Sequence, residues 1–176
     1  EYMTSDEREE NSAEYEKKYK KYEDVKLPKV GDVKYFVDIY PNRRAVHAKT
    51  NIQLVNEESV AIDSLHFNVS KNWNMEINIP GSKLAYEDDD FGYLIYVLDK
   101  PMQPQAVMDI EISSKFISKG FNNDRGNTSV VKNGTFLNNG DILPNLGYNA
   151  DRELSDKNTR KKYDLLPKER MPELTS

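Results

Sequence analysis

The chain contains no cysteine, and this absence excludes several classes of protein. Without thiols there is no disulfide scaffold, no thiolate zinc site and no cysteine nucleophile. No apolar run approaches the roughly 18–20 residues that span a bilayer, and no signal-peptide pattern opens the chain. Because the chain begins with Glu1 rather than Met, we expect it to be a piece of a longer protein.

Basic residues are fewer than acidic ones. The 25 Lys and Arg residues against 30 Asp and Glu give a net charge of -5, and the pI is about 5.2. Nucleic-acid binding needs a clustered basic face, so we expect no nucleic-acid partner. Hydrophobic residues make up 37% of the chain and the mean hydropathy is -0.82, which indicates a polar chain with a lean core. The 176 residues fit one domain with a tail.

Residues 1–26 have the pattern of an amphipathic helix or linker. Tyr15, Tyr19 and Tyr22 recur at the spacing of one helix face. The lysines fall mostly on the other side; they are Lys17, Lys18, Lys20 and Lys21. A basic helix on a membrane surface is an alternative, but interspersed acids dilute its positive field. We therefore expect the tyrosines to lie against a protein surface.

Residues 27–31 form a connection, and from Asp32 onward the hydrophobic period changes to two. The clearest alternation covers residues 46–54, where one face is apolar and the other polar. The apolar face carries Val46, Ala48, Thr50, Ile52 and Leu54. The polar face carries His47, Lys49, Asn51 and Gln53. Such alternation is typical of an antiparallel strand with one buried and one exposed face.

Several further runs predict strands. Residues 33–39, 65–69, 73–79 and 108–116 alternate, and residues 91–98 are apolar on both faces, as in a central strand. Turns separate these runs, with a loop expected at residues 100–105, and Asn133-Gly134 favours a further hairpin. About seven strands joined by short turns predict an all-β fold, an antiparallel β-sandwich or a barrel. We assign the sandwich to residues 27–140.

Residues 141–176 are expected to be largely irregular. One polar helix is predicted over residues 151–162, with Asp151 or Ser155 as its cap. Pro167 and Pro172 then interrupt regular structure.

No self-sufficient catalytic group is evident in the sequence. The two histidines, His47 and His66, are too few for a zinc site without carboxylates, and we expect both to face solvent. The acidic run at residues 87–90 lacks the spacing of a calcium loop and is interpreted as a charged hairpin turn. Phosphate loops, nucleophile elbows and the helical H-E-x-x-H motif are absent from the sequence.

Five short motifs nevertheless follow one another in a distinctive order. They are Val37-Asp38-Ile39-Tyr40-Pro41, Arg44-Ala45-Val46-His47-Ala48, Leu54-Val55-Asn56, Ile62-Asp63-Ser64-Leu65 and Leu98-Asp99-Lys100-Pro101-Met102. With the tyrosine-rich helix before them, they resemble the amino-terminal β-domain of the aminopeptidase N family of zinc peptidases. The stretches 133–137 and 142–148 are similar to one subgroup, the aminopeptidase-like domains fused to membrane segments of bacterial ABC-type permeases. The resemblance covers roughly residues 14–166.

The resemblance implies a saddle-shaped sandwich that packs beside a thermolysin-like catalytic domain in the same chain. Zinc and its ligands would belong to that following domain, so this chain itself would hold no cofactor and would not be an enzyme. Upstream membrane segments would attach the protein to the extracytoplasmic, periplasmic face of a bacterial membrane.

The resemblance also implies which residues lie near substrate. In the family, the amino-terminal domain contributes one polar residue that helps to hold the substrate's free amine. An ungapped count places Thr135 there, with Gly140 and Asn145 departing from the family's arginine and cysteine. These departures leave the activity of the parent chain open. The residues expected near the cleft are Asn133, Thr135, Leu143, Pro144 and Tyr148.

A second hypothesis is a free-standing sandwich that binds protein or carbohydrate. Such a module would use an aromatic platform built from Trp73, Tyr93 or Tyr96. These aromatics alternate in phase with Ile and Val, however, so we expect most of them in the core.

Overall fold

The computed structural model describes residues 3–118, 130–132 and 134–168. The chain forms two compact units. One consists of Asp24–Tyr148, and the other combines Glu1–Glu23 with Asn149–Ser176. Sequence periodicity gives no sign that these two distant segments belong together.

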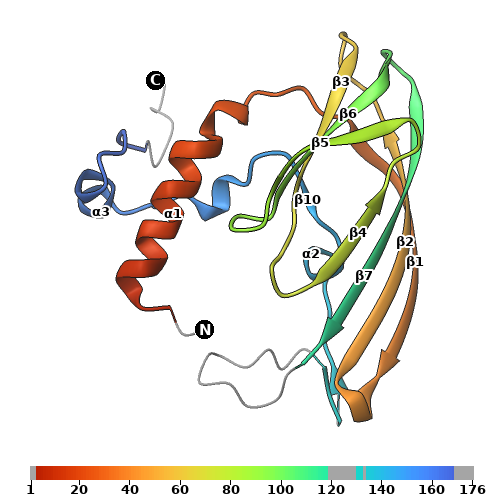
Figure 1. The fold of residues 1–176 in the computed structure, drawn as a ribbon, viewed down its shortest axis with the longest axis horizontal. Coiled ribbons are helices and arrows are strands. Elements are labelled where there is room, and N and C mark those ends of the chain that lie inside the picture. The colour runs from red at the N-terminus through yellow and green to blue at the C-terminus, as the bar shows by residue number, and fades with distance from the viewer. Residues whose placement is uncertain (1–2, 119–129, 133, 169–176) are drawn as a thin grey trace, which may run out of the picture. The chain divides into compact units, whose positions relative to one another are not determined.

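The unit of residues 24–148 is an antiparallel β-sandwich, as the sequence predicts. Figure 1 shows its strands. The first sheet has the order β1 (Lys29–Tyr40), β2 (Ala45–Val55), β7 (Val107–Ile117) and β4 (Asn74–Asn78). The second sheet has the order β10 (Asn145–Leu146), β3 (Ile62–Asn68), β6 (Tyr93–Met102) and β5 (Ser82–Asp88). The central position of β6 confirms the prediction from its two apolar faces.

The main core lies between the two sheets. β2 alternates as predicted: its five apolar-face residues are buried and its four polar-face residues are exposed. The first sheet contributes Ile52, Leu54, Ile110 and Ile112 to the core cluster. The second sheet contributes Ile62, Leu65, Phe67, Leu98 and Met102. Burial of these side chains is the main source of the sandwich's stability, at about 1.5–3 kcal/mol for each large apolar side chain.

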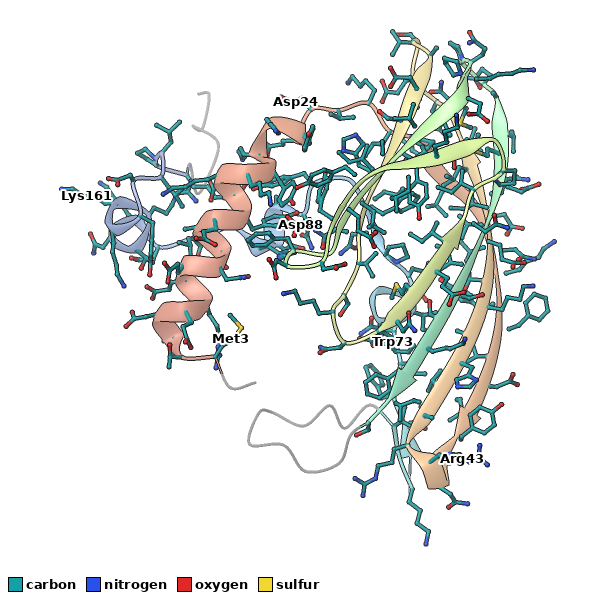
Figure 2. The ribbon with its side chains drawn as sticks, in the orientation of Figure 1. Met3, Asp24, Arg43, Trp73, Asp88 and Lys161 are labelled. Atoms are coloured by element: carbon teal, nitrogen blue, oxygen red, sulfur yellow. The ribbon has the colours of Figure 1, made fainter. Side chains whose placement is uncertain are left out.

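A second core cluster surrounds the only tryptophan of the chain. Trp73, labelled in Figure 2, precedes β4 and packs its ring against Phe116 of β7, with the ring centroids 5.3 Å apart. Val46, Val130 and Ile142 complete the contact. Trp73 is 6% exposed and Tyr93 is fully buried, so these aromatics belong to the interior, as their phase predicts.

Three details of the strands differ from the sequence prediction. β6 continues through Pro101 to the buried Met102, because Met102 pairs with Ile62 where a loop was expected. On β1, Val37 and Ile39 are 38% and 43% exposed although they lie in phase with the buried side. The hydrophobic period predicts on which face of the sheet a side chain lies, but not how deeply it is buried. Because β1 is an edge strand with a neighbour on one side only, its core-facing side chains stay partly in solvent.

His66 is the third difference, since it is buried rather than facing solvent. Its Nδ1 lies 3.0 Å from the Tyr93 hydroxyl, and the two rings meet edge to face. β3 has neighbours on both sides and is buried on both faces over residues 65–68. Burial lowers the pKa of His66, while the carboxylate of Asp63 raises it to a smaller extent. His47 is exposed, as predicted.

The other unit contains the predicted tyrosine helix, α1 (Ser5–Tyr19), which continues into the 3-10 turn η1 (Lys20–Tyr22). Thr4 and Glu7 form a capping box at its start. Tyr15 and Tyr19 are buried together, with ring centroids 5.3 Å apart. Among the described residues, no helix is both long and apolar enough to cross a membrane.

The later segment of this unit contains the 3-10 turn η3 (Ala150–Arg152) and the helix α3 (Lys157–Lys162). The predicted single helix over 151–162 is therefore wrong in extent, and its cap is Asp156, whose side chain accepts hydrogen bonds from the amides of Asn158 and Thr159. Neither Asp151 nor Ser155 caps α3, because Asp151 lies within η3 and Asp156, one residue after Ser155, takes the N-cap position.

Buried ion pairs join the two segments of this unit. Arg160 donates to both carboxylate oxygens of Glu16, at 2.6 and 2.9 Å, with both side chains at least nine-tenths buried. Glu153 pairs with Lys20 on one oxygen and Lys168 on the other. A buried, doubly hydrogen-bonded pair of this kind adds little net stability over apolar packing, but removing one partner leaves an uncompensated charge.

Thr50 provides a test of the core assignment. Its hydroxyl is fully buried and has no hydrogen-bond partner within the described part of the chain. Since an unsatisfied buried hydroxyl carries a desolvation penalty, Thr50→Val is expected to raise the free energy of unfolding by about 1 kcal/mol. Thr50→Ser, which keeps the hydroxyl and loses a methyl group, is expected to lower it by about 1 kcal/mol. Urea unfolding followed by Trp73 fluorescence measures both; a less stable valine variant would show that the hydroxyl has a partner.

Candidate functional site

The segment expected near a substrate cleft forms part of the sandwich unit. It contains the short hairpin strands β8 (Val130–Val131) and β9 (Gly134–Thr135), the helix α2 (Asn139–Ile142) and β10. β8 and β9 pair as the Asn-Gly signal predicts, with Val130 opposite Thr135. Asn133 itself lies outside the described residues.

Local capping explains why α2 forms at this position. The side chain of Asn138 accepts a hydrogen bond from the amide of Asp141, whose carboxylate in turn accepts from the amide of Asn138. Pro144 disfavours helical geometry at the residue before it, so the helix ends and Leu143 is extended. The Ser114 hydroxyl donates to the carbonyl of Ile142 at 2.7 Å and ties α2 to β7.

After Pro144 the segment joins the second sheet. Asn145 and Leu146 pair with Asn68 and Phe67 of β3, and the amide of Gly147 donates to the carbonyl of His66 at 2.8 Å. Gly147 has a φ of +76°, which a residue with a side chain rarely adopts. The segment is thus anchored to the first sheet through α2 and to the second sheet through β10.

A pocket of about 330 Å³ lies beside this segment. Leu143 and Pro144 line it, so the structure brings these two predicted residues together. The other apolar lining residues are Val30, Ile52, Leu54, Phe67, Ile110, Ile112 and Leu146. Asn139 and Asn145 are the polar side chains at its wall. The pocket is suited to an apolar group with one or two hydrogen-bonding atoms, and its lining residues offer no nucleophile or ionisable group.

The remaining predicted residues lie elsewhere on the segment. Thr135 is exposed on β9, and Tyr148 is half-buried at the end of the unit; neither lines the pocket. Phe136, which the sequence analysis did not single out, is 76% exposed directly after Thr135. In the sequence, Phe136 is a large aromatic residue that lies outside any alternating run, and this position could have indicated that its side chain is exposed.

The pocket walls from the other strands could not have been assigned from sequence. Val30, Phe67 and Ile110 come from three different strands and meet only through the sheet topology. Within residues 3–118, 130–132 and 134–168, no group of three His, Asp or Glu side chains is arranged to hold a metal ion.

The fold is thus an antiparallel β-sandwich, and its segment of residues 134–148 is attached to both sheets. No known family model matches the chain, and no curated protein matches it either.

Proposed function

We propose that this chain is the non-catalytic amino-terminal domain of a zinc aminopeptidase-like, membrane-attached protein. In this role it packs against a thermolysin-like domain that follows in the same chain and shapes one side of the cleft. The proposal rests on the order of the sequence motifs together with the β-sandwich fold. Zinc would be held by the following domain, on the periplasmic face of the membrane.

The exposure of Thr135 and Phe136 supports the proposed contact with the following domain. The resemblance places Thr135 nearest the substrate amine, and the adjoining Phe136 leaves 76% of its surface in solvent. Aromatic residues such as Phe are enriched in protein–protein interfaces. Leu143 and Pro144, on the same anchored segment, add a further apolar wall.

The alternative role as a carbohydrate- or protein-binding module receives less support. Two of its three candidate platform aromatics, Trp73 and Tyr93, are buried, and Tyr96 is half-buried. Stacking on a sugar ring requires an accessible aromatic face.

The reading frame of the gene tests the proposal directly. We expect membrane segments before Glu1 and an H-E-x-x-H motif after Ser176. A stop codon immediately after Ser176 would contradict the proposal, as would aminopeptidase turnover by the purified 176-residue chain supplied with zinc.

In the full-length protein, Phe136→Asp places a charge in the proposed apolar contact with the zinc domain. We expect it to weaken this contact and to lower peptidase activity about tenfold or more. Limited proteolysis between the two domains gives a second readout, since cleavage there should become faster when docking is weakened. Val107→Asp introduces the same charge at another exposed site, 55% accessible, and is the matched control. Both variants should unfold in urea like the unmodified chain. Equal effects of the two substitutions on docking would show that residue 136 is not at the domain contact.

A further inference from the structure

Within the described residues, β1 is the longest of the strands that end the two sheets of the sandwich. Four strands end the two sheets: β1 and β4 in the first, β10 and β5 in the second. β4 and β10 are short, with five and two residues, and β5 carries a register irregularity between Leu84 and Tyr86. β1 has 12 residues; it has a register irregularity near its start, between Val30 and Asp32, and pairs regularly with β2 from Asp32 to Tyr40. Natural sheets usually protect such an edge, because it is a template for another strand.

Apolar side chains on β1 are exposed on both faces of the sheet. Phe36 is 60% exposed and Tyr40 37% exposed on the outward face. On the core-facing side, Val37 and Ile39 are 38% and 43% exposed. A partner that continues the sheet along this edge would cover all four of these side chains at once.

We propose that β1 pairs antiparallel with β1 of a second copy of this chain, with Phe36 opposite Phe36 of the copy. In this register Lys34 lies opposite Asp38 of the copy, and the two-fold axis repeats that pair. Val33 lies opposite Ile39 on the other face. From position 33 to position 39, each residue thus meets one that complements it in charge or in apolar character, while Asp32 meets Tyr40 at the ends of the pairing. Such matching is the condition for a self-complementary two-fold interface.

Neighbouring registers lack this complementarity. A two-fold axis at Tyr35 would place Asp32 opposite Asp38, so like charges would be opposed. An axis at Val37 would place Phe36 opposite Asp38, an apolar ring against a carboxylate. The sequence of β1 therefore favours one register, and the dimer would join two four-stranded sheets into one continuous sheet.

Charge reversal tests the register. Lys34→Asp and Asp38→Lys each oppose like charges twice and are expected to raise the dimer dissociation constant about tenfold or more. The double variant Lys34→Asp, Asp38→Lys restores both pairs and should dimerise like the unmodified chain. An equimolar mixture of the two single variants should form a heterodimer, since every opposed pair is then of opposite sign. Analytical ultracentrifugation measures all four samples.

Lys83→Asp, on the edge strand β5, is the matched control and is expected to leave the dimer unchanged. A chain that stays monomeric at its highest soluble concentration overturns the proposal, as does a dimer that the single reversals at positions 34 and 38 do not weaken.

Cross-linking gives a second readout that does not depend on charge. The chain has no cysteine, so Phe36→Cys introduces a single thiol, and opposed Cα atoms in an antiparallel pair lie about 4.5–5.5 Å apart. A short bismaleimide should join two Phe36→Cys chains and should not join two Lys83→Cys chains. Equal cross-linking of both variants would overturn the proposed pairing.

Discussion

Ile52→Asp is expected to unfold the sandwich. Ile52 is 5% exposed and lies in the main core cluster between Val33 and Ile110 of the neighbouring strands. An unpaired carboxylate at this position would lose its hydration without gaining a partner, at a penalty of several kcal/mol. That penalty is comparable to the roughly 5–15 kcal/mol by which a domain of this size is stable. Circular dichroism should show the loss of β structure, and Trp73 fluorescence should show solvent exposure of the second cluster.

His47→Ala is the control on the same strand. His47 is exposed on the opposite face, and its ring meets the Tyr40 ring edge to face, with centroids 5.2 Å apart. Its removal is expected to change the free energy of unfolding by less than about 1 kcal/mol. If His47→Ala were the more damaging substitution, the assignment of the two faces of β2 would be wrong.

Gly92→Ala is expected to have the second largest effect. Gly92 ends the turn between β5 and β6 with a φ of +66°, and its carbonyl accepts a hydrogen bond from the amide of Val69 at 2.7 Å. A Cβ at this position would overlap the backbone carbonyl oxygen of Val69. Because that oxygen is part of the main chain, no side-chain rotation relieves the overlap. We expect a loss of roughly 3–5 kcal/mol, with the hydrogen bond displaced.

Gly81→Ala separates backbone strain from the overlap. Gly81 has nearly the same φ, +68°, but among the described residues beyond its chain neighbours no atom lies within 4 Å of the site where its Cβ would be. It should therefore show the conformational penalty alone, about 1–2 kcal/mol. Urea midpoints of the two variants measure the difference; similar losses would mean that the approach of Gly92 to Val69 is looser in solution.

The fold could be predicted from the sequence where one face of a strand meets the core and the other meets solvent. β2 satisfies this condition from Val46 to Leu54, which is why the alternation of apolar and polar residues was sufficient to predict both the strand and its buried face. β1 and His66 show the limit of the method. Periodicity does not tell whether a strand lies at an edge, as β1 does, or is covered on both faces, as β3 is around His66. Those properties follow from strand order, which depends on distant parts of the chain.

The candidate site could be predicted only in part, for a related reason. Leu143 and Pro144 are adjacent in sequence and share the pocket, so a local motif was enough to place them together. Thr135 was assigned by counting positions, and the structure puts it on a hairpin away from that pocket. The α2 cap at Asn138 was readable in principle, because Asn followed three residues later by Asp is a known helix-start pattern.

The Glu16–Arg160 pair has a consequence for how the chain is made. These residues are 144 positions apart in the sequence, and the whole sandwich is encoded between them. During translation the sandwich can fold as a unit soon after it leaves the ribosome. Helix α1 is synthesised before the sandwich but must wait for Arg160 to emerge before the Glu16 carboxylate is neutralised, so this unit completes its tertiary contacts after the sandwich that is encoded within it.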